Sequence, residues 1–325
     1  MRRLSAIFAV AAVCLAVLLS SCGDPVEPEG NGGDKPAKKE LTRGQMDSML
    51  FVKYEPLNGK PVTVYYYIPS EGDVTTMKVL FAMHGTGRNA DDQIGYWKKT
   101  ADAKGVIVIA PGFYKKYYPN LDYQYGGVSN YSDHFDARVQ ELWTYNIVEK
   151  VFDWLKAETG NISERYDLWG HSAGSQFTHR FLLWMPDARV HKAITSNAGS
   201  YTFPTPDGVS YEGVSYGFPY SISDTGIGKE QLAKYFSRDL TVHLGTADVA
   251  TTLEQDPNLP TGPGALAQGS CRFERGHNFF DCAKHIADSL GVPFNWKLVE
   301  VPNVAHSAGT MVKTANVGAA ALMYQ

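Results

Sequence analysis

Short runs of apolar, often β-branched residues alternate with longer amphipathic stretches from about residue 60 to the end of the chain. The short runs predict strands, and the stretches whose apolar residues recur every three or four positions predict helices. The predicted strands are 62–68, 78–83, 106–109, 165–169, 190–196, 240–244 and 295–301, and the predicted helices are 142–160, 172–184 and 273–290. This alternation indicates an α/β domain with a mostly parallel central sheet and helices on both faces.

Two long segments interrupt this rhythm. Residues 112–135 are crowded with Tyr, Gly and Asn, and residues 200–228 with Tyr, Gly, Pro and Ser. Long loops in such a domain are functional or disordered, and the aromatic content here argues against disorder. Tyr201, Phe203 and Tyr211 follow strand 190–196, and we interpret them as packing within the loop in preference to ligand contacts.

The N-terminus has the pattern of an export signal. Arg2 and Arg3 precede an apolar run from Leu4 to Leu19, which is short for a membrane span. The run ends in Leu-Ser-Ser-Cys22, which resembles the lipobox of bacterial lipoproteins, where the cysteine is lipidated. We therefore expect a signal peptide (1–21), a disordered tether (22–40) and a catalytic domain (41–325) anchored to the cell envelope, facing the periplasm or the cell surface. The alternative is signal cleavage without a lipid.

The charge balance of the chain bears on its partners. Without residues 1–21, the chain has 28 basic and 34 acidic residues, a formal net charge of −6, which argues against a nucleic-acid partner. The expected mature chain keeps two further cysteines, Cys271 and Cys282. An intervening helix would hold them about 16 Å apart, too far for a disulfide. A bond would require the helix to begin after Cys271 and the preceding loop to fold back, and the question stays open.

Residues 170–174 read Gly-His-Ser-Ala-Gly, between a predicted strand and a predicted helix. This G-x-S-x-G pattern in that context predicts a nucleophile elbow, in which a strained turn exposes Ser172 at the edge of the sheet. The helix N-terminus would favour negative charge developing there. The alternative is that Ser172 only caps the helix and that the glycines form a tight turn.

A glycine-containing loop, His84-Gly-Thr-Gly87, follows the predicted strand 78–83. Its main-chain N–H groups could bind an oxyanion, as loops of the HG type do in lipases and esterases. We expect Thr86, in preference to Gly85, to supply one N–H and Ala173 to supply the other. We interpret His84 as a structural residue that holds the loop.

An acid and a base are expected downstream, in the order Ser, Asp or Glu, His. Asp248 follows strand 240–244 after three residues, with Glu254 and Asp256 as reserve acids farther along the loop. His306 follows strand 295–301 and fits the base; its alternative role is a solvated loop residue. The other nearby histidines lie within predicted helices, a strand or the elbow. We find no metal-binding motif and expect no metal and no cofactor.

With these motifs in order, the chain from about residue 60 resembles the α/β-hydrolase superfamily. The short HG loop, the Gly-His-Ser-Ala-Gly-Ser elbow and the lack of a long helical cap are similar to secreted esterases related to polyhydroxybutyrate depolymerases and feruloyl or acetylxylan esterases. Depolymerases of this group often have a cysteine where this chain has Thr86. The resemblance implies hydrolysis of an extracellular carboxylic ester through an acyl-enzyme on Ser172. Polymeric and carbohydrate-linked esters are among the substrates that it allows. A peptidase or acyltransferase with the same triad, or a noncatalytic binding lipoprotein, are the alternatives.

Overall fold

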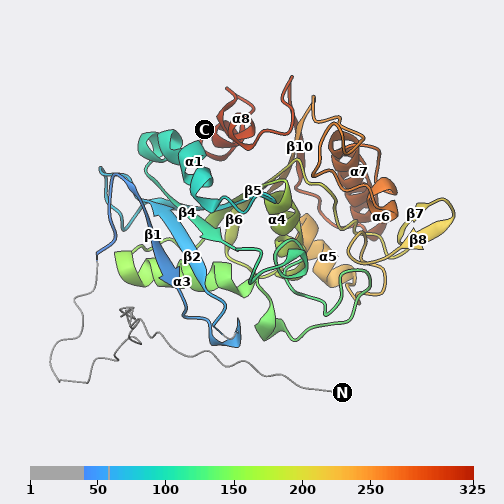
Figure 1. The fold of residues 1–325 in the computed structure, drawn as a ribbon, viewed down its shortest axis with the longest axis horizontal. Helices are drawn as coiled ribbons and strands as arrows, with labels where there is room; N and C mark the ends of the chain where they lie inside the picture. Colours follow the sequence, from blue (N-terminus) through green and yellow to red (C-terminus); the bar gives the residue numbers. More distant parts are fainter. Residues whose placement is uncertain (1–39, 58) are drawn as a thin grey trace, which may run out of the picture. The chain divides into compact units, whose positions relative to one another are not determined.

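A computed structural model describes residues 40–57 and 59–325 (Figure 1). The predicted signal peptide, Cys22 and the predicted tether except Glu40 lie outside these residues. Within them, eight strands form one sheet in the order β1-β2-β4-β3-β5-β6-β9-β10. The strands are β1 (Met46–Phe51), β2 (Val62–Tyr67), β3 (Lys78–Met83), β4 (Val106–Gly112), β5 (Tyr166–His171), β6 (Val190–Ser196), β9 (Leu240–Gly245) and β10 (Lys297–Val301).

The sheet is mostly parallel, as predicted. β2 runs antiparallel to both β1 and β4, and every neighbouring pair from β4 to β10 is parallel. The predicted strands 78–83 and 190–196 coincide with β3 and β6, and β4 extends three residues beyond its predicted end. The carboxyl ends of the parallel strands therefore meet at one edge, where ligands bind in open α/β sheets.

Helices cover both faces of the sheet, because the side chains of the central strands alternate between two apolar layers. In β3, Val79 and Phe81 pack into one layer and Leu80 and Ala82 into the other. The first layer contains α3 (Asn146–Thr159), α4 (Ala173–Trp184), α5 (Lys229–Phe236) and α7 (Arg272–Leu290). The second contains α1 (Ala90–Lys104), α8 (Ala308–Lys313) and α9 (Ala319–Met323), and Figure 1 shows α1 beside α8.

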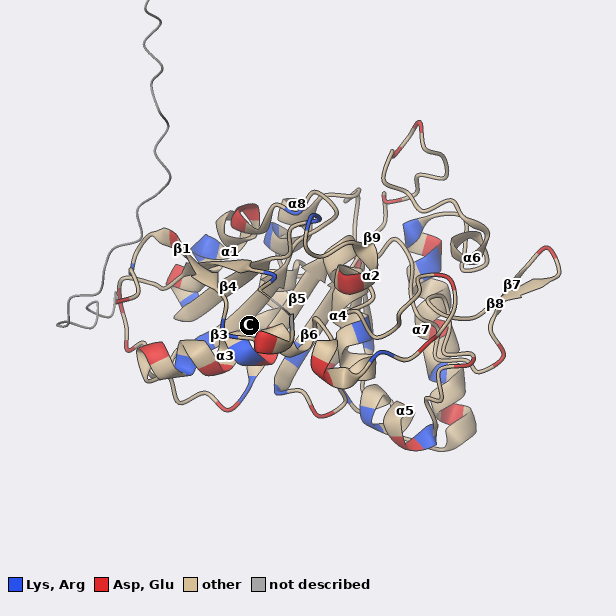
Figure 2. Ribbon diagram, turned by 60° about the horizontal axis from the view of Figure 1, so that its bottom comes forward, with Lys and Arg blue, Asp and Glu red and all other residues tan. Residues whose placement is uncertain are grey.

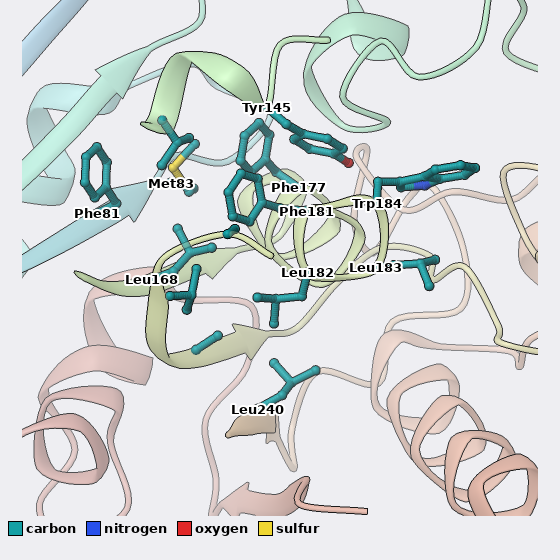
Figure 3. Close-up of a cluster of buried hydrophobic side chains, with 14 of the residues drawn as sticks. Phe81, Met83, Tyr145, Leu168, Phe177, Phe181, Leu182, Leu183, Trp184 and Leu240 are labelled. Carbon is teal, nitrogen blue, oxygen red and sulfur yellow. The ribbon is translucent and has the colours of Figure 1, made fainter. Parts of the chain in front are cut away.

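The helix α4 is buried on all sides. Figure 3 shows its Phe177 and Phe181 beside Tyr145, with Leu168 of β5 close by. The ring centroids of Tyr145 and Phe177 lie 4.9 Å apart in an edge-to-face arrangement. Burial of each such side chain stabilises the fold by about 2 to 3 kcal/mol. The residue that precedes α4, Ser172, is consequently held on a rigid part of the molecule.

The two aromatic segments are ordered and contain no large helical domain. Residues 112–135 include the short helix α2 (Asn120–Tyr123), whose Tyr123 is fully buried. Residues 200–228 include a hairpin of β7 (Val209–Tyr211) and β8 (Val214–Tyr216). Tyr201 is buried and stacks on Phe279 of α7 with centroids 4.5 Å apart, and Phe203 contacts the same ring. Both contacts are packing contacts, as expected for these residues.

The helix α3 begins at Asn146, four residues later than predicted, because Leu142 belongs to the 3-10 helix η2 (Gln140–Leu142). The helix α7 begins directly after Cys271, and both Cys271 and Cys282 are free thiols.

Among the helices of the described residues, none combines the length and the apolar character needed to span a bilayer. Figure 2 shows both charge signs on α3, α5 and α7.

Candidate active site

The connection between β5 and α4 forms a strained turn at Ser172, whose backbone φ is 57° and ψ −117°. A Cβ atom at Gly170 would lie 2.1 Å from the carbonyl oxygen of Gly174, and one at Gly174 would lie 2.1 Å from the carbonyl oxygen of Met83. Such contacts exclude larger residues. The Ser172 N–H donates to the carbonyl oxygen of Ser196 at 3.0 Å, which ties the strained turn to β6. The geometry is that of the predicted elbow.

The loop that follows β3 runs beside this turn. A Cβ atom at Gly85 would lie 3.7 Å from the Cβ of Ser172. Thr86 is exposed, and Ala173 is buried as the first residue of α4. The two amides proposed from the sequence as oxyanion donors therefore come from two segments that meet at Ser172. Helix N-termini and glycine-rich loops bind negative charge through main-chain N–H groups of this kind.

His84 holds this loop in place. The Phe113 N–H donates to its Nε2 at 3.0 Å, so that the Nδ1–H donates to the carbonyl oxygen of Gly85 at 3.0 Å. Its ring stacks on Tyr123 at 4.4 Å, and the Tyr123 hydroxyl donates to the His84 carbonyl oxygen at 2.6 Å. Burial lowers the pKa of His84 to about 3, so the ring is neutral. These contacts agree with the structural role expected for His84.

Asp248 and His306 are brought together by the connections that follow β9 and β10. Asp248 Oδ2 and His306 Nδ1 lie 2.6 Å apart. The two connections pack closely, since the Ala247 N–H donates to the carbonyl oxygen of Val304 at 3.0 Å and a Cβ at Gly245 would lie 2.3 Å from that same oxygen. Asp248 is buried, whereas the His306 side chain is 23% exposed. The imidazole is therefore accessible from solvent, whereas the carboxylate is shielded from it.

The base also lies beside the elbow. The ring centroids of His306 and His171 are 4.5 Å apart, and His171 is the residue before Ser172. The structure thus brings Asp248 and His306 into contact beside the turn that carries Ser172, at the carboxyl edge of the sheet. The reserve acids are placed differently: Glu254 is exposed, and Asp256 contacts an arginine.

That arginine, Arg272, is a residue of the site that the sequence did not reveal. Its Nη1 lies 3.5 Å from Asp248 Oδ1 and 2.5 Å from Asp256 Oδ2. The side chain is 1% exposed, so the guanidinium and the Asp248 carboxylate form a buried ion pair. Burial acts to raise the pKa of Asp256, but the Asn258 amide and Arg272 outweigh it, and the net pKa is lowered. Asp256 therefore stays ionised and shares the guanidinium with Asp248.

His171, the histidine within the elbow, is buried against His306. Its Nε2 has no hydrogen-bond partner among the described residues. Burial, and then the neighbouring His306, hold the pKa of His171 well below its usual range. A neutral ring at this place contributes no positive charge against a protonated His306.

No group of three or more His, Cys, Asp or Glu side chains in the described part of the chain is arranged to hold a metal ion.

Solved structures similar to this one include several hydrolases. A poly(aspartic acid) hydrolase from Sphingomonas sp. KT-1 is 33% identical, with 82% of this chain and 96% of that chain covered and a TM-score of 0.74. A poly(3-hydroxybutyrate) depolymerase from Bordetella parapertussis is 29% identical, covering 82% and 87%, with a TM-score of 0.72. An S-formylglutathione hydrolase from Staphylococcus aureus, 16% identical over 89% and 100%, has a TM-score of 0.52 and shares the fold. No protein-family model and no curated sequence matches the chain.

Proposed function

The chain belongs to the α/β-hydrolase superfamily, and we propose that it is a serine hydrolase that cleaves carboxylic esters, with Ser172 as the nucleophile. The observation that carries this proposal is the 2.6 Å contact between Asp248 and His306 beside the strained turn at Ser172. A noncatalytic binding protein would have no need for this acid and base at the carboxyl edge next to a serine on an elbow.

In the proposed reaction, His306 removes the proton from the Ser172 hydroxyl as its oxygen attacks the acyl carbon. Asp248 accepts a hydrogen bond from His306 Nδ1–H, which leaves Nε2 free to act as the base. The main-chain amides of Thr86 and Ala173 stabilise the oxyanion. His306 then donates its proton to the leaving alcohol, and water attacks the acyl-enzyme with the same histidine as base. No step in this scheme requires a metal or a cofactor.

A second candidate reaction is hydrolysis of an amide. The relative that is 33% identical is named for poly(aspartic acid), whose units are joined by amide bonds, and the relative that is 29% identical is named for a polyester. The same triad serves both bonds, because only the leaving group differs. Both names support a polymeric substrate, and we propose a polymer with ester links as the first substrate to examine.

The place of action is proposed from the sequence. The signal pattern and Cys22 support export and a lipid anchor, which would place the enzyme on the envelope against an extracellular substrate. Metabolic labelling with radioactive palmitate should mark the wild-type chain and not a Cys22→Ala variant. Equal labelling of both chains would contradict the proposed anchor.

The test of the activity is hydrolysis of p-nitrophenyl acetate and butyrate by the chain from residue 23 onward. Ser172→Ala should lower kcat by about four to six orders of magnitude. A matched control is Ser289→Ala, which removes an exposed serine hydroxyl on α7. A fluorophosphonate probe should label the wild type and the control but not Ser172→Ala. Full activity in Ser172→Ala would refute the nucleophile, and cleavage of aminoacyl anilides faster than esters would favour the amide reaction.

A further inference from the structure

A surface groove of about 640 Å³ adjoins His306. One wall is Tyr96 of α1, and the other is formed by the end of the loop after β10 and by α8, with Ser307, Thr310, Lys313 and Thr314 among its residues. The helices α1 and α8 pack against each other, so the groove lies between elements that contact each other in the fold (Figure 1). Nothing in the proposed mechanism uses these residues.

The groove borders His306, the residue that must contact the leaving group in the proposed reaction. If Ser172 is the nucleophile, His306 delivers its proton to the leaving oxygen, and proton transfer requires hydrogen-bond distance between the two. The leaving group must therefore contact His306, and the groove is a space that this histidine borders. This inference rests on the proposed function.

The chemistry of the groove is polar and includes a cation. The hydroxyls of Ser307 and Thr310 lie 2.8 Å apart, so one donates to the other and the hydroxyl that accepts can donate to a further acceptor. The Lys313 ammonium lies 5.5 Å from the centre of the Tyr96 ring. The Lys313 side chain is exposed, and no carboxylate of the described residues lies within 4 Å of its nitrogen. Its charge is thus not neutralised by a close partner within that part of the chain.

Two acidic residues lie near the far wall. Burial, and then Asp92 and Asp91 at the start of α1, raise the pKa of the Tyr96 phenol, which remains a neutral group. The carboxylate of Asp92 already accepts a hydrogen bond from Asn89. The groove therefore offers a cation and neutral hydroxyls to a ligand that approaches His306.

We propose that this groove binds the leaving-group side of the substrate and that Lys313 selects a leaving group with a negative charge, such as an alcohol that bears a carboxylate. Chains of ester-linked hydroxy acids release such alcohols when cleaved near their carboxyl end. An exposed ion pair of this kind changes binding by about two- to five-fold.

The test compares two acetate esters that differ in the charge of the leaving group: 4-acetoxybenzoate, which is anionic, and its neutral methyl ester. The measured quantity is the ratio of their kcat/KM values, because intrinsic differences in reactivity cancel when this ratio is compared among variants. Lys313→Met should lower the ratio about two- to five-fold, and Lys313→Glu should lower it further. In the wild type, the ratio should fall as salt is raised to 0.5 M.

The matched control is Lys229→Met, which removes an exposed lysine from α5 in the other helix layer. An unchanged ratio in both Lys313 variants, or an equal change in the control, would overturn the assignment of the groove while the esterase proposal stands. If the wild type cleaves neither ester, the proposed function fails and this inference fails with it. Circular dichroism establishes that each variant is folded, and all of the altered side chains are exposed.

Discussion

Replacing Arg272 by Met is expected to destabilise the fold strongly, because the ion pair that Arg272 forms is buried. The guanidinium and the Asp248 carboxylate are each at most 2% exposed, and Asp256 is 15% exposed. Without Arg272, two carboxylates would face one another with no cation between them. Breaking a buried pair from one side costs about 3 to 5 kcal/mol, because it leaves an uncompensated buried charge. For a domain of this size, that loss lowers Tm by roughly 6 to 20 °C.

A double variant separates charge from packing. The two carboxylates and the guanidinium carry a net charge of −1, which becomes −2 in Arg272→Met and returns to −1 in Arg272→Met/Asp256→Asn. The double variant should therefore recover at least about 1 kcal/mol of the free energy of unfolding lost by the single variant. Lys284→Met, which removes an exposed ion pair on the same helix, should change stability by no more than about 0.5 kcal/mol.

Activity gives the second measurement of the same perturbation. Arg272 contacts Asp248 and not the reacting atoms, so we treat it as a positioning residue for the acid. A misplaced Asp248 misaligns His306, and we expect kcat to fall roughly 10- to 100-fold with KM nearly unchanged. The double variant should recover part of kcat. The reasoning is refuted if Arg272→Met keeps its Tm and kcat, or if the double variant is no better than the single one in either measurement.

Two further predictions concern the surroundings of the site. Gly174→Ala should abolish activity and folded yield, because its Cβ would lie 2.1 Å from the Met83 carbonyl oxygen. The control is Gly95→Ala on α1, where a Cβ has open space, and it should be neutral or stabilise the fold by up to about 1 kcal/mol. Equal folded yields of the two variants would contradict this prediction. Burial lowers the pKa of His84 to about 3 and of His243 to about 4, below the unfolded value of about 6.5. Between these folded and unfolded pKa values, the unfolded chain binds more protons than the folded one. As pH falls from 7.5 to 5, the free energy of unfolding should therefore decrease by about 2 kcal/mol for each of the two histidines. Urea unfolding measures this change, and a rise in stability over that range would contradict it.

The parts of the fold that could be predicted are those in which burial leaves a continuous signal in the sequence. β3 is a parallel strand in the middle of the sheet with apolar residues on both faces from Val79 onward, and β6 is buried from Ala193 onward, so both strands can be recognised. The edge strand β1 was missed because its residues alternate between exposed and half-buried, and its place is fixed by pairing with β2. The helix α1 was missed because few of its residues are apolar and its first turn is acidic.

The candidate site was predictable to the extent that strand order dictates it. Parallel strands end at the same edge, so the residues that follow β5, β9 and β10 had to lie along one edge of the sheet. The choice among Asp248, Glu254 and Asp256 could not be made as firmly from the sequence, since all three lie in one loop. The loop folds so that Asp248 reaches His306 and Asp256 reaches Arg272.

Arg272 is harder to recognise from the sequence, but its position is unfavourable for an arginine, and this conflict is a signal that could have indicated its role. It is the first residue of α7, and the partial positive charge of a helix N-terminus disfavours an arginine there. A cation at such a position needs carboxylates that outweigh the dipole, and the structure supplies two. The Phe273 N–H also donates to the Asp248 carbonyl oxygen at 3.3 Å, so the loop that carries the acid supplies a partner for an end of the same helix. A basic residue at a helix start, with acids in the preceding loop, is therefore a testable sign of a buried ion pair beside a catalytic carboxylate.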